Sequence, residues 1–253
     1  TLALEYLGHT DMVRSISCDP RGQYLASGSD DGTVRLWEVV TGRCLQTLKL
    51  GGEGVVKVAW CPNSALSLLA VATGQRVLLI QPSVGDQLVV SQTDALLADW
   101  PEESADGTCV DERVAQAVRW KRPTSEEWSL TGGSIRLIIE HFKPVTQISW
   151  HGRGDYFATV MPDGQNRSVV INQVSRRRSQ LPFTRSKGLV QCVLFHPHRP
   201  LLFVATQRCV RVYDLAKQEL LKKLLSNSRW ISTMAVHPGG DNLLVGTYDR
   251  KML

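Results

Sequence analysis

The chain has 253 residues, a size that fits one large all-β domain or two ordinary domains. Hydrophobic residues make up 43% and charged residues 21% of the chain, proportions typical of a globular protein rather than a disordered or fibrous one. The longest apolar runs are strand-sized, too short for a membrane-spanning helix, and the first residues show no secretion signal, so we expect an intracellular protein.

The net charge of +5 hides an uneven distribution. Residues 86–112 contain eight carboxylates and no lysine or arginine, which leaves 29 basic against 16 acidic residues, a net +13, in the rest of the chain. The six cysteines include no C-x-x-C pair. We therefore expect no metal site, and thiols that are reduced and mostly buried.

Four short strands are predicted near the start of the chain. Apolar and β-branched residues are enriched over 12–18, 23–29, 33–39 and 43–49, and turn residues separate these stretches. Four antiparallel strands of this length form one small sheet of the kind that makes a β-propeller blade.

The first of these strands recurs four times further along the chain. When Val13, Val56, Val145, Val190 and Ile231 are taken as equivalent, the successive steps are 43, 89, 45 and 41 residues. A step of 40 to 45 residues is the period of WD40 blades. The sequence therefore predicts about five blades.

The doubled step predicts a long insertion in the second blade, although a degenerate extra blade is an alternative. Strands are expected at 67–73 and 76–81, and residues 134–140 then supply the outer strand. Residues 86–133 between them are acidic and show no clear strand alternation. We expect this insertion to be partly disordered, with a short helix at 111–120, and to bind a partner if it is ordered.

Four polar residues of the first repeat match the pattern of the WD40 family: His9, Ser27, Asp31 and Trp37. The resemblance implies that they form a buried hydrogen-bonded relay that holds three strands together. Ser, His and Asp also occur together in hydrolases, but the spacing is that of the WD40 relay and no G-x-S-x-G motif is present. Phosphate-binding loops and paired-carboxylate motifs are also absent from the sequence. We predict a protein that is not an enzyme and that uses no cofactor and no small-molecule substrate.

Residues 1–253 thus resemble a partial WD40 propeller. The last residues fall within the third strand of the fifth repeat, and we expect a seven-bladed ring with two further blades beyond residue 253.

Three longer stretches, at 143–160, 174–224 and 231–253, carry motifs more specific than the general repeat, among them HGRGDYF and SRRRSQ. They resemble the C-terminal propeller of the block-of-proliferation (Bop/Erb) ribosome-biogenesis family. The resemblance implies a nucleolar and nucleoplasmic scaffold that joins a pescadillo-type protein and a second WD-repeat protein of the Ytm type in a trimeric complex. That complex acts on pre-60S particles and is needed for maturation of the large-subunit rRNAs. The fold alone also allows a substrate-recognition propeller of a ubiquitin ligase or a histone-tail reader.

The densest basic cluster consists of Arg176, Arg177, Arg178, Arg185 and Lys187. A guanidinium group suits phosphate because its planar fork donates two hydrogen bonds. We expect the three consecutive arginines to project from one exposed loop and to contact RNA or a partner protein. The competing interpretation is a solvated, charged loop without a partner.

Overall fold

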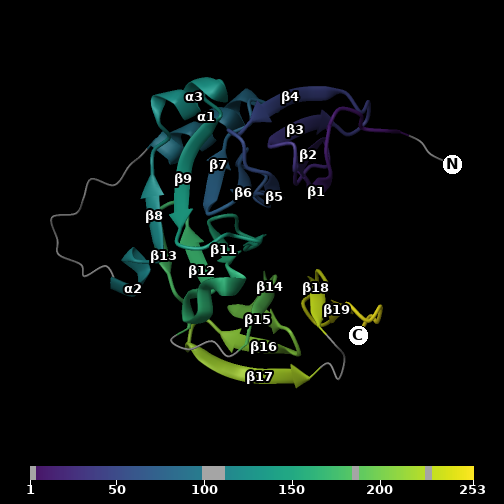
Figure 1. Ribbon diagram of the computed structural model, residues 1–253, viewed down its shortest axis with the longest axis vertical. Coiled ribbons are helices and arrows are strands. Elements are labelled where there is room, and N and C mark those ends of the chain that lie inside the picture. The colour runs from purple at the N-terminus through teal and green to yellow at the C-terminus, as the bar shows by residue number, and fades with distance from the viewer. Residues whose placement is uncertain (1–3, 99–111, 184–187, 226–229) are drawn as a thin grey trace. The chain divides into compact units, whose positions relative to one another are not determined.

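The computed structural model describes residues 4–98, 112–183, 188–225 and 230–253 (Figure 1). The chain divides into two compact units, residues 1–148 with 175–177 and residues 149–174 with 178–253. Each unit is described by itself. Both consist mainly of small antiparallel sheets, which confirms the predicted all-β fold with blade-like sheets.

The first unit begins with a four-stranded sheet in the order β1-β2-β3-β4. Its strands are β1 (Val13–Cys18), β2 (Tyr24–Ser29), β3 (Thr33–Glu38) and β4 (Cys44–Lys49). Every boundary lies within one residue of the prediction. The tight turn between β2 and β3 depends on Gly32, whose φ of 74° is unfavourable for residues with a Cβ atom.

The second sheet has five strands in the order β5-β6-β7-β9-β8. The strands are β5 (Val55–Trp60), β6 (Leu69–Thr73), β7 (Arg76–Ile80), β8 (Val118–Lys121) and β9 (Ile135–His141). β9 is the predicted outer strand. β8 was not predicted, and it pairs antiparallel with β9 as a fifth strand at the edge of the sheet.

In the described part of the chain before β9 there are three helices: α1 (Gln87–Ala98), α2 (Glu112–Ala115) and α3 (Ser125–Leu130). The predicted helix at 111–120 is wrong in extent: its described part holds α2 and then β8. α1 was missed altogether. Asp86 caps its first turn by accepting a hydrogen bond from the Leu88 N–H at 2.9 Å, and the residues that it buries, Val90, Thr93 and Leu97, follow helical spacing.

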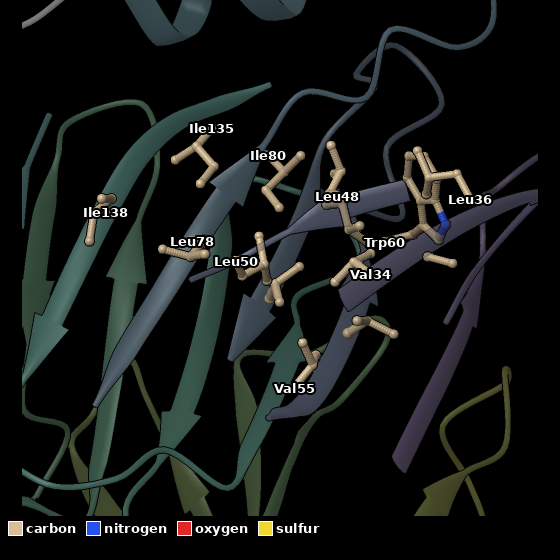
Figure 2. Packing of buried hydrophobic residues seen from close by; sticks show 14 residues of the cluster. Val34, Leu36, Leu48, Leu50, Val55, Trp60, Leu78, Ile80, Ile135 and Ile138 are labelled. Carbon is tan, nitrogen blue, oxygen red and sulfur yellow. The ribbon is translucent and has the colours of Figure 1, made fainter. Parts of the chain in front are cut away.

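The first two sheets share one apolar core, and Figure 2 shows side chains from both sheets in it, among them Leu48 and Ile80. Its members are Ala26, Val34, Leu36, Leu48, Leu50, Val55, Val58, Trp60, Leu69, Val71, Leu78, Ile80, Ile135 and Ile138. Burial of one such aliphatic side chain contributes about 1.5 to 3 kcal/mol. Packing is close enough that a Cβ atom on Gly28 would meet Val55 Cγ1 at 2.4 Å.

Serine side chains connect β1 to β5, two strands that do not pair through their backbones. Ser15 Oγ accepts a hydrogen bond from the Val58 N–H at 3.2 Å, and Ser17 Oγ accepts one from the Trp60 N–H at 3.0 Å. These bonds satisfy backbone donors that would otherwise lack a partner at the junction of two sheets.

The second unit contains sheets in the orders β10-β11-β12-β13, β14-β15-β16-β17 and β18-β19, with the first two residues of β10 assigned to the first unit. The third sheet has β10 (Gln147–Trp150), β11 (Tyr156–Val160), β12 (Val169–Gln173) and β13 (Arg178–Gln180), with a 3-10 segment at Pro162–Arg167. The fourth has β14 (Val190–Phe195), β15 (Leu201–Thr206), β16 (Cys209–Asp214) and β17 (Glu219–Leu225). The last pair is β18 (Ile231–Val236) and β19 (Leu243–Thr247).

The backbone register shows the repeat directly. The first strand of four sheets carries the same irregularity, directly after Val13, Val55, Val190 and Ile231. The structural equivalent of Val13 in the second sheet is therefore Val55, one residue before the Val56 taken from the sequence. This shared β-bulge indicates that the sheets are copies of one structural unit.

Candidate functional site

The predicted relay is formed in the first sheet. His9 Nδ1 lies 2.9 Å from Asp31 Oδ2, His9 Nε2 lies 2.7 Å from Ser27 Oγ, and Trp37 Nε1 donates to Ser27 Oγ at 2.8 Å. All four side chains are almost completely buried. The structure brings these four residues together in one connected network.

The hydrogen bonds of the relay run in one direction. Trp37 can only donate, so Ser27 Oγ accepts from it and keeps its own proton available for His9 Nε2. The other ring nitrogen of His9, Nδ1, then carries the proton that it donates to Asp31. This assignment leaves each of the four groups with a partner.

Asp31 is the main acceptor of the relay. Burial of this carboxyl opposes ionisation, but hydrogen bonds from Thr33 and His9 and from the backbone N–H groups of Thr10 and Thr33 together hold its pKa well below the ordinary value. Asp31 Oδ1 accepts from the Thr33 hydroxyl at 2.6 Å and from the Thr33 N–H at 2.9 Å. The carboxylate thus holds the β2–β3 turn as well as His9.

The relay has the residue types of a hydrolase triad but not its geometry. Ser27 Oγ is buried, accepts from Trp37 and donates to His9. A catalytic serine needs a free face toward substrate and a nearby oxyanion-binding group. Ser27 is engaged on both sides inside the sheet, so the network acts as a structural clamp.

Histidines hold the turn after the first strand in three sheets of the second unit, a role that the sequence analysis did not assign. Nδ1 of His151, His196 and His237 accepts a backbone N–H from the residue two positions further on, at 3.3, 3.0 and 3.1 Å. Asp19 does the same with its carboxylate in the first sheet. Accepting at Nδ1 requires a neutral ring, and burial lowers the pKa of His151 and His196.

The arginine triplet does not form one exposed loop. Arg176 and Arg178 are exposed, but Arg177 is only 8% exposed and has a left-handed φ of 51°. Its guanidinium Nη2 donates to the Leu96 carbonyl at 2.6 Å. The prediction is therefore wrong for Arg177, which serves the structure, and Arg185 and Lys187 lie outside the described residues.

The Leu96 carbonyl lies in the last described turn of α1. The last turn of α1 contains no basic residue of its own. Arg177 brings a positive charge and a hydrogen-bond donor to this turn. It connects the segment between β12 and β13 to the insertion.

Charged groups of the insertion pair with arginines of the second sheet. Arg136 Nη2 lies 2.8 Å from Asp94 Oδ1, and Arg76 Nη1 lies 2.9 Å from Glu127 Oε1. The Arg136 guanidinium also lies 5.1 Å from the centre of the Trp128 ring. These contacts fix α1 and α3 against the sheet, so part of the acidic insertion has an internal role.

Within the described ranges, no group of three His, Cys, Asp or Glu residues is placed to hold a metal ion. Of the helices that the structure describes, none is both long and apolar enough to cross a membrane.

Comparison with known proteins gives matches of two kinds. The family model for the WD domain, G-beta repeat, matches residues 1–38. Proteins named ribosome biogenesis protein BOP1 homolog match along 99% of this chain, with 60% identity over 250 residues in Aedes aegypti, 58% over 253 residues in Drosophila willistoni and 59% over 251 residues in Drosophila virilis. The chain is homologous to the block-of-proliferation proteins. It spans 28, 32 and 31% of the length of these three Bop relatives.

The two kinds of match agree with the structure. The WD-domain match ends at Glu38, the last residue of β3, and covers the whole relay. Other sheets use different polar contacts: in the third sheet, Ser179 donates to Asn172 Oδ1 at 2.7 Å. The Bop relatives match far beyond the part with the common WD pattern, so the homology does not depend on the repeat signature alone.

Proposed function

We propose that this protein is a non-catalytic scaffold for biogenesis of the large (60S) ribosomal subunit and maturation of its rRNAs. The observation that carries the proposal is identity of 57 to 60%, along 99% of the chain, to relatives whose names state ribosome biogenesis. Identity at this level over so many residues includes surface positions, which a shared fold alone does not require.

The chemistry of the described residues supports a scaffold. The Ser-His-Asp set is closed within the first sheet, where Ser27 has no free face toward a substrate. Rigid sheets with exposed connecting segments suit the binding of other macromolecules.

The partners proposed are a pescadillo-type protein and a second WD-repeat protein of the Ytm type, in a trimeric complex that acts on pre-60S particles in the nucleolus and nucleoplasm. Arg176 and Arg178 are the proposed contacts to rRNA phosphates or to a partner, because they are exposed on either side of the anchored Arg177. Two charges held by a fixed backbone lose less conformational freedom on binding than charges on a free loop.

The test is affinity purification of the intact protein from cells, followed by identification of the proteins and RNAs that accompany it. We expect pescadillo and 60S precursors. Recovery of a ubiquitin-ligase adaptor or of histones in their place would overturn the proposal.

The same purification with Arg176→Glu and Arg178→Glu together separates the proposed contact from the proposed function. Loss of rRNA with retained protein partners assigns the two arginines to RNA, and loss of one protein partner assigns them to that protein. If the proteins and RNAs recovered are unchanged at both low and high salt, both arginines are exposed to solvent and contact no partner.

A further inference from the structure

β17 has an open outer edge with an unusual composition. It is the last strand in the order β14-β15-β16-β17, and all seven residues of Glu219–Leu225 are exposed. Among the described residues, no strand pairs with its outer side. Such an edge presents backbone N–H and C=O groups in the geometry of a sheet.

The edges of the other three large sheets differ from this one. β13 has only three residues, and β4 carries a single charged residue, Lys49, at its end. In the second sheet, the outer side of β9 is already occupied by β8. β17 is thus the longest outer edge that is open within the described parts of the chain.

The second sheet shows how this fold accepts a fifth strand. β8 pairs antiparallel with β9, with Arg119 opposite Glu140 and Trp120 opposite Ile139. An ion pair joins the added strand to the sheet, with Lys121 Nζ 2.6 Å from Glu140 Oε2. Backbone pairing supplies the attachment, and opposite charges and apolar neighbours select the strand.

β17 carries positive charges that would favour an added strand with negative charges. Its register with β16 places Lys222 opposite Val212 and Lys223 opposite Arg211, so the two lysines lie on opposite faces of the sheet. Neither is in an ion pair with a described carboxylate. Each shares its face with one of the two following residues, Leu224 and Leu225. Lysines on an edge disfavour pairing with a second copy of the same strand.

We propose that the outer edge of β17 binds an extended segment of a partner protein by strand addition, and that this segment carries two adjacent acidic residues beside apolar residues. The acidic pair would meet one lysine on each face, and the apolar residues would cover the leucines. This interaction does not depend on the proposed contact at Arg176 and Arg178.

The test uses the intact protein and a labelled synthetic peptide with two central glutamates flanked by two valines on each side. Binding is measured by fluorescence anisotropy. We expect this peptide to bind at least tenfold more tightly than the same peptide with lysines in place of the glutamates, as two cross-strand ion pairs become two repulsions. Lys222→Glu with Lys223→Glu should reverse that preference.

Two controls distinguish strand addition from general charge attraction. N-methylation of the peptide amides on the side that faces β17 should abolish binding, and methylation of the alternate amides should not. Lys49→Glu removes an exposed lysine from the edge strand of another sheet and should leave binding unchanged. Equal binding of the two methylated peptides, or equal effects of Lys49→Glu and the double variant, would overturn the proposal.

Discussion

Replacing Arg177 with methionine tests the finding that one arginine of the triplet anchors the insertion. Methionine keeps an unbranched apolar stem but removes the guanidinium that donates to the Leu96 carbonyl. Arg176→Met and Arg178→Met are matched controls, because both parent side chains are exposed. The three substitutions change the same chemistry at adjacent positions.

The magnitude follows from the contact that is lost. A hydrogen bond from a charged donor contributes about 1.5 to 3 kcal/mol. A domain of 150 to 250 residues melts about 2 to 4 °C lower for each kcal/mol, so we expect Arg177→Met to lower Tm by about 3 to 12 °C. Arg177→Gly should cost about 1 kcal/mol less than Arg177→Ala, because glycine adopts the positive φ without strain.

Thermal melts of the intact protein and hydrogen exchange of the amides of Gln87–Ala98 measure the two consequences. We expect faster exchange in α1 for Arg177→Met and parental exchange for both controls. If all three methionine variants melt and exchange alike, Arg177 does not hold α1 and the role assigned to it is wrong.

Three further outcomes are expected. Asp31→Asn should lower the free energy of unfolding by about 1 to 3 kcal/mol. The folded-state pKa of this carboxyl lies below its ordinary 3.8, so the stability that the carboxylate contributes is present above pH 3.8 and is lost as the pH falls through the folded-state value. Urea melts of the variant at a series of pH values should lack that acid-dependent loss of stability. Burial lowers the pKa of His141 from 6.5 to about 4. The stability that the neutral ring allows is therefore present above pH 6.5 and is lost as the pH falls toward 4. His141→Gln should make the free energy of unfolding, measured by urea melts, less dependent on pH across that interval. Arg176→Glu with Arg178→Glu should leave Tm near the parental value and reduce the slope of log K against log salt for single-stranded rRNA by about 1.4, the value for two phosphate contacts; an unchanged slope would exclude those contacts.

The first sheet was predictable because its signals are local. Short stretches enriched in apolar and β-branched residues mark the strands, and turn residues such as Gly32 mark the boundaries. The relay was predictable because the spacing of four residue types is shared by a large family. Both features depend on residues close together in the chain.

Two helices and one strand within the insertion were not predicted, although part of their signal was readable. Thr124 and Glu127 form a capping box, a sequence pattern that marks the start of α3, and Asp86 followed by apolar residues at helical spacing marks α1. β8 could not be read, because four residues are too few to show alternation and its partner strand lies further along the chain.

The arginine triplet shows a stricter limit on what can be predicted from the sequence. Three identical residues in a row have the same type and the same local context, so no pattern in the sequence separates Arg177 from its neighbours. Its role is set by Leu96, 81 positions earlier, which only the folded chain brings into contact. Tertiary contact decides burial here, not composition.

The interrupted second sheet also has a consequence for how the chain folds. β6 and β7 are joined by two residues, but the strands β7 and β9 pair across residues 81–134, a separation of 54 residues. Loop-closure entropy makes the longer closure about 3 kcal/mol less favourable than the shorter one. Pairing of β9 should therefore be a late event in folding, and a nascent chain released before residue 141 would expose the apolar edge of β7 to other nascent chains.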